Sequence, residues 1–326
     1  MKTLLPRSFL HACLTLAALI CTPLTALAQG YPTKPVKIIV PAGAGGAADL
    51  LARALGEHMG NAMGASFVTE NRGGAGGIIG SDAVAKAAPD GYTLLLTSNT
   101  LAIAPSLYKV PYDTEKDFAS VGLVASAPNL LVASADLNVK TLNELIALGR
   151  RDPDKLTYGS PAVGSAAHLT AEMLSRATGI RLTHVPFKGP QQAMMETLSG
   201  RVPLTISGVS NALPHLKSGK LVALAVAGEE RSRLVPNVQT FGELGVKGVD
   251  ASLWFGLCAP AATPRAVLDR LNAQLNASLK APEIQARLEA LGFEAIGGSS
   301  AKLADTMRRD MPAYAKVVKE ANVKAE

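Results

Sequence analysis

The chain has 326 residues, of which 48% are hydrophobic and 18% are charged, and its formal net charge is +6. This length and apolar content are sufficient for the hydrophobic cores of two domains. The modest positive charge is spread along the chain without a basic run or interleaved aromatic residues, which argues against nucleic acid as a partner.

Residues 1–28 have the pattern of an export signal. Lys2 and Arg7 give a basic start, residues 9–20 are apolar apart from His11, and Ala26-Leu27-Ala28 is a small-x-small cleavage site. We predict cleavage after Ala28, which would leave 298 residues and lower the formal net charge from +6 to +4. Later stretches of the chain are interrupted by Gly, Pro or charge before they reach the length of a membrane span. The mature protein is therefore expected to be soluble and exported.

The cysteines support no intrachain disulfide after cleavage. Cys13 and Cys21 would be removed with the signal, which leaves Cys258 alone. Cys21 raises the question of a lipid anchor, but Ile20 stands before it, where a lipoprotein signal has Gly or Ala. The sequence therefore favours an unanchored protein.

Strands and helices alternate along most of the mature chain. We predict strands at 36–40, 66–70, 92–97, 121–125, 129–134, 156–159, 181–186, 203–207 and 221–227, and helices at 47–59, 77–87, 141–150, 165–178, 190–199 and 211–218. Such alternation is typical of an α/β fold with parallel strands and helices on the faces of the sheet. We expect two sheets of this kind.

The pattern changes after an extended segment at 251–259. Thr263-Pro264 predicts the start of a helix at 264–281, and helices at 282–291 and 301–321 follow. We expect the chain to cross between domains near 125–129 and to return near 250–256. The predicted domains are 29–127 plus 253–326 and 128–252, joined by a hinge.

One short passage occurs twice, 119 residues apart. The segment from Gly45 to Leu55 aligns without a gap on the segment from Gly164 to Leu174, with six of eleven positions identical. Each copy follows a predicted strand and starts a helix, so each is expected to direct unpaired backbone N–H groups and the positive end of a helix dipole at one point. Two readings remain open: a remnant of duplication, or two anion-binding loops that hold one ligand between them.

Small polar loops follow the predicted strands at one edge of each sheet, where open α/β sheets bind ligands. Each loop alone could be a tight connection, but together they favour a site; they span residues 42–46, 71–77, 97–99, 160–165 and 207–211. The loops after the first strand of either domain lack Lys and Arg, and Arg72 is the nearest basic residue. Backbone N–H groups and hydroxyls would then hold an anion. His168 aligns with Asp49, and either residue could contact the ligand or cap its helix.

An enzyme is the main alternative. Residues 43–48 match the dinucleotide fingerprint G-x-G-x-x-A, and Glu70 lies 22 residues beyond at a strand end, where a ribose contact is expected. The export signal and the second copy of the loop argue against this exported oxidoreductase. The sequence has neither a Walker-type loop nor a G-x-S-x-G elbow, and its scattered histidines do not suit a common zinc site. We predict no enzymatic activity, cofactor or metal.

Several motifs, in order along the mature chain, resemble the Bug, or tripartite tricarboxylate transporter, substrate-binding receptors. They are Tyr31 to Pro41, Gly45-Gly46-x-x-Asp49, Glu70 to Gly77, Pro89 to Leu94, Tyr158 to Pro161 with His168-Leu169, His184 to Gly189, and Trp254 to Leu257 with Ala259-Pro260. Ala42 and Ala44 depart from the family pattern, which commonly has an aromatic residue and a proline there. Pro203 replaces the usual acidic residue of the second domain. The resemblance covers essentially the whole mature chain.

The resemblance implies a periplasmic, two-domain Venus flytrap receptor that closes on a small carboxylate, with a membrane permease as the expected recipient. We also expect the receptor to be a monomer. It implies that the two glycine loops grip the carboxylate through amides and ordered water. The predicted ligand-binding residues are Ala44, Gly45, Gly46, Asp49, Ser98, Asn99, Ser160, Gly164, Ser165, His168 and Ser207.

Overall fold

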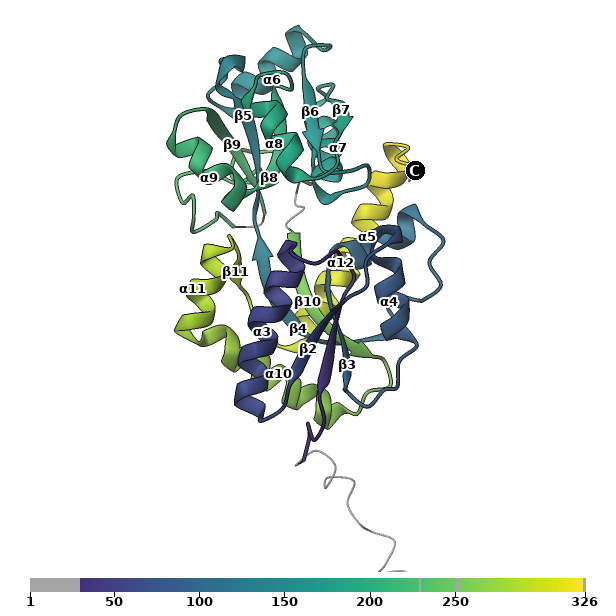
Figure 1. Ribbon diagram of the computed structural model, residues 1–326. Helices are drawn as coiled ribbons and strands as arrows, with labels where there is room; N and C mark the ends of the chain where they lie inside the picture. Colours follow the sequence, from purple (N-terminus) through teal and green to yellow (C-terminus); the bar gives the residue numbers. More distant parts are fainter. Residues whose placement is uncertain (1–29, 229, 250–252, 325–326) are drawn as a thin grey trace, which may run out of the picture.

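The computed structural model describes residues 30–228, 230–249 and 253–324, which form two β-sheets flanked by helices (Figure 1). The predicted export signal and its cleavage site lie outside the described residues, as do residues 250–252 of the predicted second crossing. We call each sheet with its helices a lobe. The first lobe holds the six-stranded sheet and the second lobe holds the five-stranded sheet.

The six-stranded sheet belongs to the first lobe, which holds both the start and the end of the described chain. Its strands, in spatial order, are β11 (Glu294–Ala295), β4 (Phe118–Ala127), β10 (Leu253–Pro260), β3 (Thr93–Ser98), β1 (Val36–Val40) and β2 (Phe67–Asn71). Strands β1, β2 and β3 are parallel, and β10 pairs antiparallel with both β3 and β4. Strand β4 therefore runs in the direction of β1, β2 and β3, and its carboxyl end leads into the second lobe.

The five-stranded sheet repeats this arrangement. Its strands, in spatial order, are β7 (Thr183–Pro186), β6 (Thr157–Ser160), β8 (Leu204–Gly208), β5 (Asn129–Ser134) and β9 (Leu221–Ala227). Strands β6, β7 and β8 are parallel, whereas β5 is antiparallel to β8 and β9. The first residue of β5, Asn129, pairs with the last residues of β8 and β9, Gly208 and Ala227. The carboxyl ends of β8 and β9 thus lie where β5 enters from the first lobe.

Helices cover both sheets. Those of the first lobe are α3 (Ala47–Met63), α4 (Ile78–Ala85), α5 (Thr100–Leu107), α10 (Arg265–Lys280), α11 (Pro282–Ala290) and α12 (Ser300–Glu320), with the short 3₁₀ turn η1 (Ala75–Gly77). Those of the second lobe are α6 (Leu142–Arg151), α7 (Ala166–Thr178), α8 (Pro190–Leu198) and α9 (Val209–Lys217), with η2 (Ala135–Leu137).

The α/β class, the two-sheet architecture and the mainly parallel sheets are confirmed. Strands β1, β2, β3 and β4 share one direction in the first sheet, and β6, β7, β8 and β9 share one direction in the second. Strands β10 and β11 of the first sheet and β5 of the second run against them. Two elements were not predicted. Helix α5 carries Pro105 in its interior, which the sequence pattern treats as a helix breaker, and β11 has only two residues.

Alternation along the strands explains why both faces of the first sheet are covered. Ile38 of β1 packs in the core beneath α3 and α10, where Leu51 and Leu271 lie. Its neighbour Ile39 faces the opposite side, in the core that includes Leu303 of α12. Consecutive residues of a strand point to opposite faces, so a strand buried on both sides is apolar throughout.

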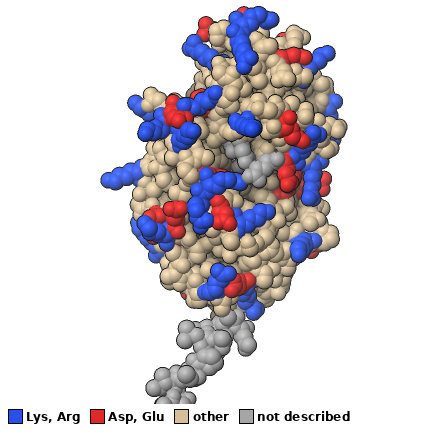
Figure 2. All heavy atoms as spheres, turned by 180° about the vertical axis from the view of Figure 1, so that it is seen from behind, with Lys and Arg blue, Asp and Glu red and all other residues tan. Residues whose placement is uncertain are grey.

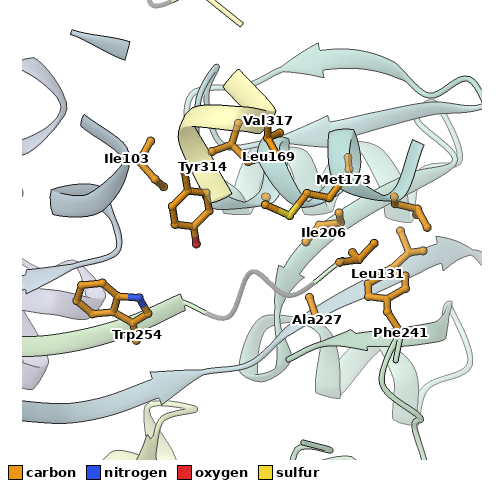
Figure 3. Packing of buried hydrophobic residues seen from close by; sticks show 14 of the residues in the cluster. Ile103, Leu131, Leu169, Met173, Ile206, Ala227, Phe241, Trp254, Tyr314 and Val317 are labelled. Atoms are coloured by element: carbon orange, nitrogen blue, oxygen red, sulfur yellow. The ribbon is translucent and has the colours of Figure 1, made fainter. Parts of the chain in front are cut away.

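The core around α12 continues into the second lobe. Figure 3 shows Tyr314 and Val317 of α12 beside Leu169 and Met173 of α7, all within one buried cluster. An ion pair of 2.9 Å between Arg176 of α7 and Glu320 of α12 lies at the end of this contact. The last helix of the first lobe is therefore packed against the second lobe.

The described surface agrees with a weakly charged protein. Figure 2 shows Lys and Arg side chains interspersed with Asp and Glu on the face seen from behind. Within the part of the chain that the structure describes, none of the helices combines the length and the apolar character needed to cross a membrane. Cys258 is a free thiol buried in β10, and burial raises its pKa to about 12.

Candidate functional site

The carboxyl ends of the parallel strands in the two sheets face each other. Strand β4 leaves the first lobe at its carboxyl end, and β1 and β3 point the same way. In the second lobe, β6 and β8 end beside the start of β5, which comes directly from the first lobe. The predicted loops at these strand ends are thereby placed at the edges where the lobes meet (Figure 1).

The first glycine loop connects β1 to α3. Gly45 adopts the left-handed conformation at φ +78°, which favours glycine, and its N–H donates to Asp49 Oδ2 at 2.8 Å. Gly46 is the N-cap of α3 in extended conformation, and its carbonyl accepts from Leu50 N at 3.0 Å. Ala44, Gly45 and Gly46 are exposed, so the loop presents its backbone to solvent.

The second glycine loop, between β6 and α7, has the same construction. Gly164 is left-handed at φ +73°, and its N–H donates to His168 Nδ1 at 2.9 Å. Ser165 is the N-cap of α7, its carbonyl accepts from Leu169 N at 2.9 Å, and its hydroxyl accepts from His168 N at 3.2 Å. The sequence echo therefore corresponds to a repeated structure in which residue i+4 accepts the N–H of the first glycine.

These bonds determine which N–H groups remain for a ligand. In the first loop, Gly45 N and Leu50 N are used, and we find no acceptor among the described residues for the N–H groups of residues 46–49. In the second loop, Gly164, Ser165, His168 and Leu169 all donate within the protein. Residues 166 and 167 then supply the open N–H groups. Helix N-termini with open donors attract anions.

Asp49 is placed to hold the first loop rather than to repel an anion. Its side chain is 4% exposed, and Arg53 lies one turn along α3 with Nε 3.1 Å from Oδ2 and Nη2 3.0 Å from Oδ1. The hydrogen bond from Arg53 is the main cause of the lowered pKa of Asp49, with a further contribution from Gly45 N. Arg53 also donates to Asn71 Oδ1 at 3.3 Å. Because Arg53 balances the carboxylate, the first loop keeps the positive potential of its helix end.

Sequence reasoning missed Arg53 and His184. The i, i+4 spacing of Asp49 and Arg53 on one helix predicts an ion pair, and this signal was available. His184 occurred only within a family motif and carried no assigned role. In the structure its imidazole stacks on that of His168, with ring centroids 3.9 Å apart and 16° between the planes.

The two imidazoles are held in a buried polar cluster of the second lobe. Burial lowers the pKa of His168 to about 4, with a smaller contribution from His184, and burial also lowers the pKa of His184. Glu172 Oε1 lies 3.7 Å from His168 Nε2 and accepts from Tyr158 OH at 3.3 Å. Burial raises the pKa of Glu172, against the opposing effects of Tyr158 and Arg176.

The remaining predicted site residues are two at strand ends, Ser98 and Ser207, and two that are hydrogen-bonded inside the protein, Ser160 and Asn99. Ser98 is partly exposed and its hydroxyl lies 3.0 Å from Thr100 Oγ1, at the end of β3. Ser207 is 4% exposed, and its hydroxyl has no hydrogen-bond partner among the described residues. Ser160 and Asn99 are buried and bonded within the protein: the Ser160 hydroxyl to Ala162 O and the Asn99 amide to Tyr314 OH.

Asn99 yields a first prediction. Its side-chain amide donates to Tyr314 OH at 3.1 Å, and both residues are almost fully buried. Tyr314→Phe should lower the free energy of unfolding by about 1–3 kcal/mol, because a buried amide donor loses its acceptor. Urea denaturation measures this change. An unchanged midpoint would contradict a stabilising role of this hydrogen bond.

Two features lie between the lobes. A Cβ atom placed on Gly164 would collide with Leu107 Cδ1, so the second loop packs directly against α5 of the first lobe. On the hinge side, a cavity of about 590 Å³ is bordered by groups of both lobes, among them Arg233, Glu294 and Lys302. Glu294 Oε1 there accepts from Ser232 Oγ at 2.7 Å. None of the predicted site residues lines this cavity.

The arrangement gives no support to the dinucleotide alternative. Glu70, the proposed ribose contact, accepts from Arg72 Nε at 2.7 Å, and its pKa is lowered chiefly by that bond. Strand β10 lies beside β3 in the sheet and pairs with it antiparallel, whereas the sheet of a dinucleotide-binding fold has a parallel strand at that place. Among the residues described, no group of three or more His, Cys, Asp or Glu side chains is arranged to hold a metal ion.

Solved structures of known proteins share this architecture over nearly the whole chain. The periplasmic binding protein BugD is 36% identical, with a TM-score of 0.74 and coverage of 91% of this chain and 100% of its own. Rpa4515 from R. palustris, solved with adipate, is 33% identical, with a TM-score of 0.77 and coverage of 90% and 99%. MatC from Rhodopseudomonas palustris, solved with bound malate, is 32% identical, with a TM-score of 0.73 and coverage of 88% and 100%.

Sequence comparison gives the same relationship. The family model described as the tripartite tricarboxylate transporter family receptor matches residues 51–323, most of the chain. The resemblance seen in the sequence motifs is thereby confirmed, and so is the periplasmic-binding-protein fold with its two sheets. The oxidoreductase alternative finds no support among these relatives. The chain belongs to the family of tripartite tricarboxylate transporter receptors, which are solute-binding proteins.

Proposed function

We propose that this receptor binds a small carboxylate between its lobes, with one glycine loop on either side of the ligand. The observation that carries the proposal is the repeated loop, in which a left-handed glycine and its i+4 acceptor leave open N–H groups at the start of α3 and of α7. Adipate and malate, the ligands of two relatives, are carboxylates of the kind that such donors suit.

The predicted site residues have separate roles in this proposal. Gly46 and Ser165 mark the two helix starts whose N–H groups contact the carboxylate, and Ser207 offers a buried hydroxyl from β8. Ala44 borders the first loop in place of the usual proline, so it widens the entrance. Asp49 and His168 act on the loops rather than on the ligand.

The cellular setting follows from the family and from the N-terminal sequence. We propose that residues 1–28 direct export and are removed after Ala28, so that the mature receptor works as a periplasmic monomer without enzymatic activity. It passes its ligand to the membrane permease of a tripartite transporter. Residues 29–127 with 253–326 and residues 128–252 would then move as two domains about the connections between them.

Ligand binding is tested by thermal unfolding with a panel of mono-, di- and tricarboxylates that includes malate and adipate. A carboxylate at a hundredfold excess over its dissociation constant should stabilise the folded state by about 2.7 kcal/mol. NAD and NADP are the controls and should leave the melting temperature unchanged. Stabilisation by a dinucleotide at micromolar concentration, with no response to the whole carboxylate panel, would contradict the proposal.

A further inference from the structure

Two histidines hold the two ends of the second glycine loop. At its far end, Gly164 N donates to His168 Nδ1 at 2.9 Å. At its near end, the Ser160 hydroxyl donates to Ala162 O at 2.9 Å and lies 2.6 Å from His184 Nε2. The stacked imidazoles, buried at His168 and partly buried at His184, therefore connect both ends of one loop.

The hydrogen bonds around each imidazole indicate which ring nitrogen carries the proton. His168 Nδ1 accepts a backbone N–H and so carries no proton, which places the proton of its neutral form on Nε2. Ser160 Oγ lies within hydrogen-bond distance of both Ala162 O and His184 Nε2. With the hydroxyl proton directed to Ala162 O, His184 Nε2 is the donor to Ser160 Oγ, and we assign this tautomer. Both rings satisfy these bonds with Nε2 protonated.

We propose that His168 and His184 are positioning residues for ligand binding: as stacked, neutral imidazoles they hold the second glycine loop in the shape that leaves its N–H groups open. The inference rests on the proposed function of this loop. Protonation of His168 at Nδ1 would turn the acceptor of Gly164 N into a donor and break the bond. The loop then loses the contact that holds Gly164 in the left-handed conformation.

The surroundings of the pair are consistent with neutral rings. Tyr158 of β6 stacks on His184, with ring centroids 5.0 Å apart, and Glu172 of α7 is the acidic group that faces His168. Arg176, one turn beyond Glu172, is paired with Glu320 of α12. A second positive charge on this stack would be unfavourable because the rings lie in contact and are shielded from water.

The first loop uses a different acceptor for the same bond. Asp49 accepts Gly45 N as a carboxylate whose pKa is lowered, whereas His168 accepts Gly164 N as a neutral imidazole. A proton added to His168 places a positive charge on the second loop, whereas a proton added to Asp49 removes a negative charge from the first loop. The two loops of one site differ in their response to protons.

Nitrogen NMR of the ligand-free protein tests the pair directly. With ¹⁵N-labelled histidine at pH 7, we expect Nδ1 of His168 unprotonated, Nε2 of both rings protonated, and a coupling across the hydrogen bond between Gly164 N and His168 Nδ1. A proton on His168 Nδ1, or on His184 Nδ1 with Nε2 bare, would overturn the inference. This result does not depend on any ligand, so it remains decisive if no carboxylate binds and the proposed function fails.

Two substitutions at one position separate positioning from general packing. Asn places its Oδ1 at the position of His168 Nδ1, whereas Leu keeps the apolar volume without an acceptor. With whichever of malate and adipate stabilises the wild type, His168→Leu should lower affinity by about 5- to 150-fold, the factor that corresponds to an unsatisfied buried N–H. His168→Asn should recover most of that loss, because its Oδ1 can accept the N–H of Gly164. Equal affinity of the Leu variant and the wild type, or equal loss in both variants, would contradict a positioning role.

Discussion

Gly46→Asp and Ser165→Asp are each expected to weaken carboxylate binding about thirtyfold to a thousandfold. Each change places a negative charge at the helix start that offers open N–H groups to the ligand. A hydrogen bond to a charged group contributes about 1.5–3 kcal/mol, and a helix terminus adds about 0.3–1 kcal/mol. Loss of one loop should therefore cost roughly 2–4 kcal/mol of binding free energy.

The same changes should leave the unliganded fold intact. Gly46 has φ −79° and ψ 171°, which any residue can adopt, and a Cβ there meets only Gly43 O at 3.5 Å. Ser165 already caps α7 through its side chain. Aspartate is a favourable N-cap and suits the positive end of a helix. The melting temperatures of both unliganded variants should be equal to or slightly above that of the wild type.

Two control variants locate the effect. Ser299→Asp introduces the same charge at the N-cap of α12, which lies beside Phe118 at the amino end of β4. Lys302→Glu alters the hinge-side cavity. Titration calorimetry should show near-normal affinity for both controls. Loss of binding in Lys302→Glu, with normal binding in Gly46→Asp and Ser165→Asp, would move the site to the cavity.

Acid should destabilise the protein through His168. Burial lowers the pKa of this histidine from 6.5 to about 4, so between these values the unfolded chain binds a proton that the folded protein does not. The free energy of unfolding must then rise with pH across this window and fall as the pH is lowered. The contribution of His168 between pH 7 and pH 4.5 is about 2 kcal/mol. The lowered pKa of His184 adds a change of the same sign.

Urea unfolding of the wild type and of His168→Asn at pH 7 and pH 4.5 isolates this contribution. Asn does not titrate, so the variant should lose about 2 kcal/mol less than the wild type over the interval. Glu172 contributes with the opposite sign because its pKa is raised, and it does so in both proteins. An identical pH dependence of the two proteins would show that His168 is not buried as a neutral ring.

The sequence predicted the two sheets and the positions of the two glycine loops, but not the direction of every strand. The echo of Gly45 to Leu55 in Gly164 to Leu174 corresponds to two matching loop-helix junctions, because a left-handed glycine and an N-cap leave a local sequence signal. Strand direction leaves no such signal. The antiparallel placement of β10 between β3 and β4 depends on contacts between segments about 130 to 160 residues apart, so the local sequence does not reveal it.

Side-chain roles were predicted less well than loop positions. Asp49 and His168 were correctly singled out as an equivalent pair, but a sequence cannot show that each accepts the N–H of a glycine four residues earlier. Asn99 follows a strand like a ligand contact, yet its amide is directed to Tyr314, which is 215 residues away along the chain. The stacking of His184 on His168 likewise arises from the pairing of β6 with β7. Whether the open N–H groups bind a ligand stays a prediction.

Hydrogen exchange of both glycine loops tests the central claim most directly. Amide exchange of residues 45–50 and 164–169 should be measured with and without a saturating carboxylate, malate or adipate, that stabilises the protein. A ligand held between the lobes should slow exchange in both loops together and should reduce the radius of gyration as the lobes close. Slower exchange in one loop alone, with the other unchanged, would contradict a site shared by the two loops.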